Sequence, residues 1–256
     1  MAAKKKSKSR SYAELKNDMK ASLWQGHDDP LITHPIIPEE PIIITDTGHW
    51  LQPATTTIHT YFTVCAGINY EEELRLLILW QQIWQRLGYT TIVLNETHAE
   101  VHPLYAAYRA KVDTFPTINP REYDRACWLR WLALDAVGGG IMADYDVFPR
   151  ALRTLPVYDQ FTIFERGVPC LAGGTQLAIR QWIEYVMGHP DGYSPDQKHF
   201  SDMLCVRGLP SLKTESLCVQ YTDTDWLKTS FIHFSHSSTE KVRPRHKNIE
   251  ALLALK

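Results

Sequence analysis

The pattern of apolar and polar positions predicts strands and helices in alternation from about residue 54 onward. Residues 58–65, "IHTYFTVC", are rich in β-branched and aromatic side chains and predict a buried strand. Residues 69–88 then place apolar side chains at helical spacing and stop at Gly88, which predicts a helix. Residues 89–95 predict a second strand. Because a strand, a helix and a strand joined by short connections form a βαβ unit, we expect parallel strands here.

Two more helices and a short strand are expected in the middle of the chain. Helical patterns cover residues 101–112 and, with an almost wholly apolar surface, residues 121–137. Three glycines at 138–140 follow the second helix, where glycine readily adopts the left-handed conformation that ends a helix. Residues 141–144, "IMAD", then predict a short buried strand. These elements favour the α/β class, with a mainly parallel central sheet.

Length and composition favour a single folded domain with an N-terminal extension. A chain of 256 residues suits one large α/β domain or at most two small ones, and 44% hydrophobic residues suffice for a core. Residues 1–53 open with a lysine cluster and continue into a proline-rich stretch, so we expect a basic disordered tail and an extended segment. Residues 54–256 are expected to form the domain.

Charge, cysteines and hydropathy exclude several classes of protein. A formal net charge of -2 gives no overall electrostatic attraction for nucleic acid, although the N-terminal lysines alone could contact nucleic acid or an anionic membrane. Five cysteines without a C-x-x-C spacing predict free thiols rather than a disulfide framework or a cysteine zinc site. No signal sequence, anchor or transmembrane segment is evident, so a cytoplasmic location is expected.

Two aspartates, Asp144 and Asp146, follow the short strand in "GGGIMADYDVFP". Ligands bind open α/β sheets at the carboxyl ends of the strands, and strand alternation would point both side chains to one side. Two adjacent carboxylates repel unless a cation lies between them, and Mg²⁺ or Mn²⁺ prefers carboxylate oxygens. The alternative is a turn in which the aspartates cap backbone amides.

Residues 121–149 resemble the D-x-D core of GT-A-fold glycosyltransferases, in particular those with the sugar-binding region of the yeast α-mannosyltransferase and capsular-polysaccharide type. The resemblance implies a single GT-A, Rossmann-like domain that binds a nucleotide sugar. It also implies that Asp144 and Asp146 hold Mn²⁺ or Mg²⁺ against the diphosphate of that sugar nucleotide.

The same family carries a helix arginine, preceded three residues earlier by an aspartate, and both contact the donor sugar. Arg130 matches the arginine if the extra glycine here is a one-residue insertion. The aspartate position would then be Cys127, which departs from the family pattern. Asp124, one helical turn before Cys127, is an alternative.

Related enzymes also have an Asp-Gln pair that contacts the donor sugar. Asp196 and Gln197 in "SPDQKHFSDMLC" match this pair at the start of an expected helix, although Asp196 could simply cap that helix. Asp202 is a second candidate carboxylate in the segment.

A histidine near the C-terminus is the third metal ligand in glycogenin-like and lipopolysaccharide galactosyltransferase-like enzymes. His233 in "IHF" matches it, with His236 as the alternative. The glycine and the K-P-W segment that follow in the family are absent here. Basic residues beyond it are candidate contacts for the diphosphate: Lys241, Arg243 and Arg245.

The resemblance implies a metal-dependent glycosyltransferase that moves a sugar from a UDP- or GDP-sugar to a hydroxyl of a glycan, lipid or protein. The subfamily retains the anomeric configuration, whereas an inverting enzyme would need a general base, for which Glu165 or Asp202 would serve. Gly173 and Gly174 are expected to allow close approach of a ligand.

Three alternatives differ in class. A GT-A-like module that binds nucleotide or carbohydrate without turnover fits the missing helix aspartate and the altered C-terminal motif. Polymerase-type nucleotidyltransferases and haloacid-dehalogenase phosphatases also use acidic pairs. The nucleotidyltransferases fit less well, since their glycine pair stands much farther before the acids, whereas here the glycines end a helix. The phosphatases need D-x-D-x-[TV] on the first strand, whereas this pair lies mid-chain and is followed by Val147 and Phe148.

Overall fold

The structure is a computed structural model that describes residues 54–65, 69–150, 153–190, 200–221, 229–235 and 245–254. The predictions for residues 1–53, and for five candidate site residues, lie outside the described residues. These five are Asp196, Gln197, His236, Lys241 and Arg243.

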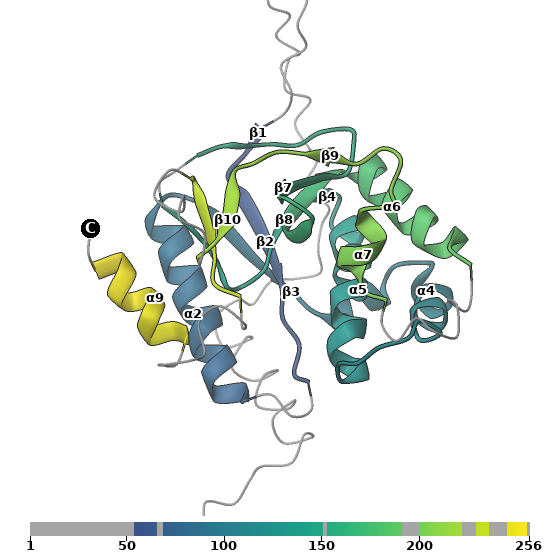
Figure 1. Cartoon of the computed structure of the whole chain (residues 1–256), viewed down its shortest axis with the longest axis horizontal. Coiled ribbons are helices and arrows are strands. Elements are labelled where there is room, and N and C mark those ends of the chain that lie inside the picture. Colours follow the sequence, from purple (N-terminus) through teal and green to yellow (C-terminus); the bar gives the residue numbers. More distant parts are fainter. Residues whose placement is uncertain are drawn as a thin grey trace, which may run out of the picture. The chain divides into compact units, whose positions relative to one another are not determined.

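The chain folds into alternating strands and helices with the labels of Figure 1. The strands are β1 (Ala54–Thr55), β2 (Thr57–Tyr61), β3 (Thr90–Leu94), β4 (Gly139–Ala143), β5 (Val147–Pro149), β6 (Leu155–Pro156), β7 (Thr162–Glu165), β8 (Val168–Thr175), β9 (Lys213–Thr214), β10 (Cys218–Gln220) and β11 (Phe231–His233). The helices are α2 (Tyr70–Arg86), α3 (Glu96–Glu100), α4 (Tyr105–Val112), α5 (Arg121–Ala136), α6 (Gln176–Gly188), α7 (Asp202–Val206) and α9 (Arg245–Ala254).

The central sheet has six strands in the order β3-β2-β4-β8-β7-β9. Strand β2 pairs in parallel with both β3 and β4, and β7 pairs in parallel with β9, whereas β8 is antiparallel to its two neighbours. Five strands therefore run in one direction. The sequence correctly predicted a mixed α/β fold with a mainly parallel sheet, and the βαβ unit β2-α2-β3 is confirmed.

A second sheet of three short strands, β10-β11-β5, lies beside the central one. Strand β11 pairs in parallel with β10 and antiparallel with β5, which places His233 opposite Val147. This pairing joins strands that are far apart in the chain, and the sequence analysis did not predict it. It brings the end of β11 next to the turn that links β4 to β5.

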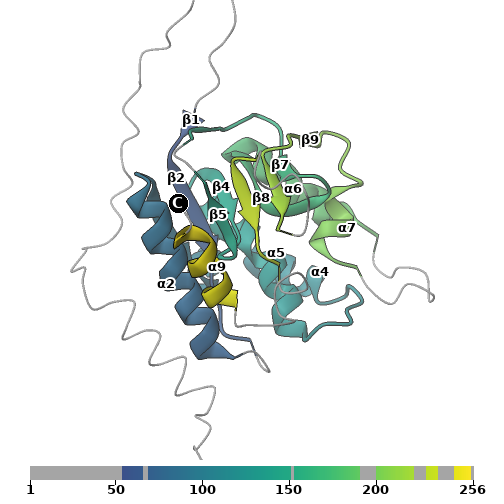
Figure 2. The same cartoon turned by 60° about the vertical axis from the view of Figure 1, so that its left-hand side comes forward.

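Helices cover both faces of the central sheet. Figures 1 and 2 show α2 and α9 on one side and α4, α5, α6 and α7 on the other. The second side holds the largest aromatic cluster, in which the Phe161 and Trp182 rings stack with centroids 5.0 Å apart. Every tryptophan in the described residues is buried, so none of these rings is available to stack on a sugar: Trp80, Trp84, Trp128, Trp131 and Trp182.

Two sequence-based predictions need correction. The helix expected over 101–112 is the shorter α4, preceded by a separate α3. Pro103 accounts for the break, because a residue before proline avoids the helical conformation. Strand β4 begins at Gly139 rather than at Ile141, so two of the glycines belong to the sheet.

The glycines bring backbones of the protein together and do not admit a ligand. A Cβ on Gly173 would lie 2.0 Å from the Gly140 carbonyl oxygen, and one on Gly174 would lie 2.8 Å from the Ala178 Cβ. The sequence analysis expected a ligand to approach Gly173 and Gly174 closely. The structure instead packs β4 against Gly173 and α6 against Gly174. Gly138, with φ +97°, has the left-handed conformation predicted after α5.

No helix within the described residues is both long and apolar enough to cross a membrane.

Candidate metal centre

The two aspartates lie on the turn between β4 and β5, at the carboxyl end of β4. The turn is closed by a bond of 2.9 Å from the Val147 amide to the Asp144 carbonyl oxygen, and the Asp144 amide donates to Cys170 of β8 over 2.7 Å. From α2, the Trp84 indole N–H donates to the Val147 carbonyl oxygen at 3.0 Å. The turn is therefore held by a neighbouring strand of the sheet and by helix α2.

His233 completes a group that we call the D-x-D cluster: Asp144, Asp146 and His233. Their ligand atoms all lie within 4.8 Å of one another. The His233 Nε2 atom is 3.6 Å from Asp146 Oδ1. The Phe234 amide also donates to the Asp146 carbonyl oxygen at 2.8 Å, which ties the end of β11 to the turn. The structure thus brings together three residues that the sequence analysis chose.

The two carboxylates have different surroundings. The Asp144 side chain is 35% exposed and accepts a hydrogen bond from Arg130. The Asp146 side chain is 13% exposed and accepts a hydrogen bond of 2.9 Å from Arg245 Nη1. The Asp146 Oδ1 atom is buried without a hydrogen-bond partner. A buried carboxylate oxygen left in this state costs free energy unless a cation or a donor reaches it.

Asp144 has a raised pKa. The surrounding protein partly shields the carboxyl group from water and raises its pKa to about 6, the Arg130 guanidinium opposes the rise, and Asp146 adds to it. Such a rise is expected for a carboxyl group that shares a partly dry site with another carboxylate.

Arg130 lies on α5 and links two elements. One side-chain nitrogen bonds Asp144, and another bonds Asp202 of α7 over 2.6 Å. Asp202 is only 5% exposed. Asp124, the alternative partner, lies apart from this pair and accepts hydrogen bonds from Thr117 and Asn119.

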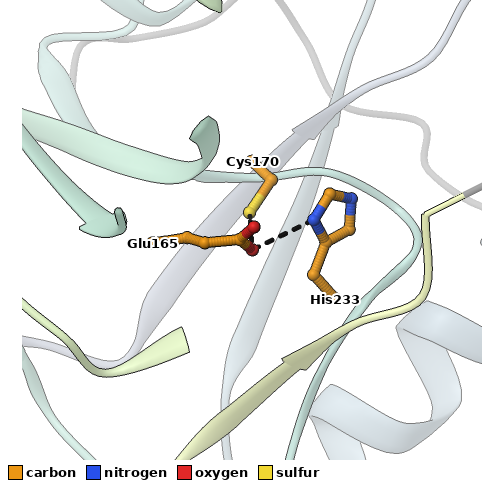
Figure 3. Close-up of side chains that lie close together, drawn as sticks. All are labelled: Glu165, Cys170 and His233. Carbon is orange, nitrogen blue, oxygen red and sulfur yellow. Dashed lines mark hydrogen bonds and ion pairs between the residues drawn. The ribbon is translucent and has the colours of Figure 1, made fainter. Parts of the chain in front are cut away.

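His233 is held on its other side by Glu165, the last residue of β7. The His233 Nδ1–H donates to Glu165 Oε2 over 3.0 Å, and the Cys170 thiol donates to the same oxygen over 3.0 Å (Figure 3). Burial would raise the pKa of Glu165, but the bonds from His233 and the thiols lower it below its usual value. Burial would lower the pKa of His233, but Cys170, Asp146 and Glu165 raise it well above its ordinary value.

Arg245 has a different role from the phosphate contact considered for it. It is 5% exposed and bonds Glu73 of α2 at 2.7 and 2.8 Å as well as Asp146. Sequence reasoning missed Glu73, which looks like an ordinary first-turn acid of a helix. It also missed Cys170 and Cys218, since no local spacing links either one to His233.

The chain belongs to a family of proteins that is defined by a domain of unknown function. The family model described as "Domain of unknown function (DUF8765)" matches residues 52–243. No curated protein matches the chain. Its fold is similar, with a TM-score of 0.40 and 12% sequence identity, to the crystal structure of a glycosyltransferase involved in the glycosylation of the major capsid of PBCV-1. That match covers 76% of this chain and 98% of the other, and it is too remote to define the chemistry of this chain.

Proposed function

We propose that this chain is a metal-dependent glycosyltransferase that transfers a sugar from a nucleotide-diphosphate sugar to a hydroxyl acceptor. The observation that carries the proposal is the D-x-D cluster, in which two carboxylates and an imidazole converge at the carboxyl end of a strand of a mainly parallel sheet. The resemblance of residues 121–149 to GT-A glycosyltransferases supports the same function.

The residues present fit a hard divalent cation, Mn²⁺ or Mg²⁺. Asp144, Asp146 and His233 would hold it, and Asp146 Oδ1, which makes no hydrogen bond in the structure, is the oxygen that remains able to bind an ion. Such an ion acts as a Lewis acid that neutralises the charge of a departing nucleoside diphosphate.

The surrounding residues position these ligands. Glu165 accepts the Nδ1–H of His233, which leaves Nε2, the nitrogen nearer Asp146, as the one to bind a metal. Arg245 donates a hydrogen bond to Asp146 Oδ2, so that the other oxygen, Oδ1, faces the cluster. Arg130 orients Asp144 through its own hydrogen bond. Lys241 and Arg243 are proposed to contact the diphosphate, and Asp196 and Gln197 the donor sugar. The donor would be a UDP- or GDP-sugar, with no role for nucleic acid.

Retention of the anomeric configuration is the stereochemistry that we favour. An inverting enzyme needs a general base near the acceptor hydroxyl. Glu165 and Asp202, the two candidates, are both buried and bonded to His233 and Arg130 respectively. Neither is free to take a proton from an acceptor.

A binding module without turnover is the second candidate. It is favoured by the same two arginines, because Arg130 and Arg245 already compensate Asp144 and Asp146 without any ion. Calorimetry with UDP or GDP and Mn²⁺, beside a turnover assay, separates the two: tight binding without product would identify the module. The expected cytoplasmic location stays a prediction.

The test is the pair of variants Asp144→Asn and Asp146→Asn. We expect each to lower Mn²⁺-dependent donor hydrolysis on the order of a thousandfold, since each removes charge that holds the stabilising ion. The assay uses a panel of UDP- and GDP-sugars, with release of the nucleoside diphosphate as the readout and titration of Mn²⁺ alongside.

Asp159→Asn is the matched control, because Asp159 is exposed and lies before the start of β7, whereas the site lies at its end. It should leave both measurements unchanged. Wild-type hydrolysis and metal dependence in both site variants would refute the proposal.

A further inference from the structure

We propose that Glu165, Cys170 and His233, together with Cys218 beside them, form a second metal site, which binds a thiophilic transition-metal ion such as Zn²⁺. We call these four residues the thiol cluster. This site is distinct in its chemistry from the oxygen-rich D-x-D cluster and does not depend on glycosyl transfer.

The geometry brings three kinds of ligand atom to one point. A carboxylate from the end of β7, a thiol from β8 and an imidazole from the end of β11 have ligand atoms within 4.8 Å of one another. Glu165 Oε2 is 3.0 Å from both Cys170 Sγ and His233 Nδ1 (Figure 3). Cys218, the first residue of β10, places its thiol 3.7 Å from the same oxygen and in contact with Cys170. Three donors therefore converge, and the Cys218 thiol lies beside them as the candidate for the fourth ligand of a closed zinc site.

Burial favours a metal over hydrogen bonding alone. The side chains of Glu165 and His233 are each 8% exposed, and Cys170 and Cys218 are 0% and 2% exposed. Thiols are weak hydrogen-bond donors, so the two of them add little to the compensation that His233 gives the buried carboxylate. A Zn²⁺ ion would displace a proton from each thiol that it binds and provide strong bonds to sulfur, nitrogen and oxygen.

The choice of ion follows from the donor set. Sulfur and imidazole ligands favour Zn²⁺ and similar ions, whereas carboxylate and water favour Mg²⁺ and Mn²⁺. A buried site of this kind is structural rather than catalytic, since a catalytic zinc keeps a position open to solvent. Here the ion would join β10 and β11 of the small sheet to β7 and β8 of the central sheet.

His233 is shared between the two clusters. If Nδ1 binds a metal in the thiol cluster, a neutral ring carries its proton on Nε2 and cannot offer that nitrogen to an ion at Asp144 and Asp146. The structure therefore predicts that Zn²⁺ in the thiol cluster weakens Mn²⁺ binding at the D-x-D cluster, and by linkage that the reverse holds.

The experiment uses the purified full chain, with Zn²⁺ content measured directly and Co²⁺ as a spectroscopic probe. We expect a single tightly held Zn²⁺ per chain and, after exchange with Co²⁺, the near-ultraviolet charge-transfer band that reports a cobalt-thiolate bond. Cys170→Ser should abolish both signals. Removing the ion with a chelator should lower the melting temperature of the wild type by several degrees.

Cys65→Ser is the matched control, because it removes a buried thiol outside the cluster. It should keep both the Zn²⁺ and the band. Glu165→Gln, which preserves size and shape, is the second variant in case Cys170→Ser does not fold, and it should hold Zn²⁺ at least tenfold more weakly. A wild-type protein without bound Zn²⁺ and without the cobalt band would overturn the proposal.

Asp144→Asn separates this proposal from the proposed function. It should keep the cobalt-thiolate band while losing Mn²⁺ binding, since Asp144 does not belong to the thiol cluster. Loss of the band in Asp144→Asn as well as in Cys170→Ser would mean that the probe reads a common structural defect, and would count against a separate site.

Discussion

At the scale of single residues, Asp146 shows how one carboxylate can be fixed in a single orientation. One oxygen is bound to Arg245, and the other is buried, makes no hydrogen bond and lies 3.6 Å from His233 Nε2. The carboxylate cannot turn over without breaking the bond to the guanidinium. A ligand held in this way needs little reorganisation to bind an ion, which is the advantage of a prearranged site.

A second residue, His59, makes a prediction about pH. Burial lowers the pKa of His59 from 6.5 to about 4, and its Nδ1 lies 3.1 Å from the Ile141 carbonyl oxygen. The folded protein therefore holds His59 neutral, while the unfolded chain takes up a proton below pH 6.5. The free energy of unfolding should therefore fall as the pH decreases from 6.5 to 4. The loss due to His59 should be on the order of 3 kcal/mol.

The measurement is urea unfolding at several pH values in this range, for the wild type and for His59→Gln. The variant should be less sensitive to acid, so that the difference in unfolding free energy between the two proteins narrows as the pH falls. A difference that stays constant from pH 7 to pH 4 would contradict the assignment.

Several site residues could be predicted from local sequence, and others could not. Asp144 and Asp146 stand one residue apart after a strand, which is a local pattern, whereas His233 was chosen from the resemblance to a known family. The partnership of Glu165 with His233 joins residues 68 positions apart, and no local pattern encodes it. The sequence placed Glu165 as a candidate base, whereas the structure buries it against an imidazole.

At the scale of elements, the pairing of β4 with β8 depends on glycine. Gly173 lies opposite Ile141, and a Cβ there would overlap the Gly140 carbonyl oxygen at 2.0 Å. Because the overlapping atom belongs to the backbone, it cannot move aside by a change of rotamer. Gly173→Ala should therefore destabilise the protein by about 3 kcal/mol or more.

The comparison is Gly188→Ala at the end of α6, where an added Cβ meets nothing within 4 Å. We expect a change within about 0.5 kcal/mol there, as for other substitutions away from tight contacts. Urea unfolding of both variants gives the two values. Equal effects would show that β8 can shift away from β4.

The periodic pattern predicted the long elements well, and the short ones poorly. Helix α2 follows its apolar spacing and α5 its long apolar stretch, and the glycine stops of both are in place. The three-residue strands β5, β10 and β11 are too short for any periodicity, and only their mutual pairing defines them. This small sheet supplies His233, so the part of the fold that completes the site is the part that sequence predicts least.

At the scale of the whole molecule, Arg245 joins three distant parts of the chain. It bonds Glu73 on α2 and Asp146 on the D-x-D turn from the first position of α9. Arg245→Met would leave two carboxylates without their cation. Breaking a buried ion pair in this way typically costs about 3 to 5 kcal/mol, and we expect a loss in that range.

Arg180→Met is the matched control. The Arg180 side chain is 55% exposed and lies 3.2 Å from Asp135, which keeps its bond to His102. Exposed ion pairs contribute at most about 1 kcal/mol to stability, so the urea concentration at the midpoint of unfolding should be close to that of the wild type. A small effect of Arg245→Met, comparable to that of Arg180→Met, would show that α9 is not needed to neutralise the site.

The fold class followed from the order of strands and helices, because that order decides which architectures are available. The assembly of the site did not follow, because it depends on β11 and α9 folding back onto a turn in the middle of the chain. Only the resemblance to a known family suggested a third ligand so far downstream.

This folding back has a consequence for when the protein becomes competent during its synthesis. Arg245 is separated from Asp146 by 99 positions and from Glu73 by 172. A chain still emerging from the ribosome would display Asp146 long before Arg245 exists, whereas Arg130, the partner of Asp144, precedes both aspartates. Contacts between such distant positions form slowly, so Asp146 should stay without its guanidinium partner until the ribosome has passed residue 245.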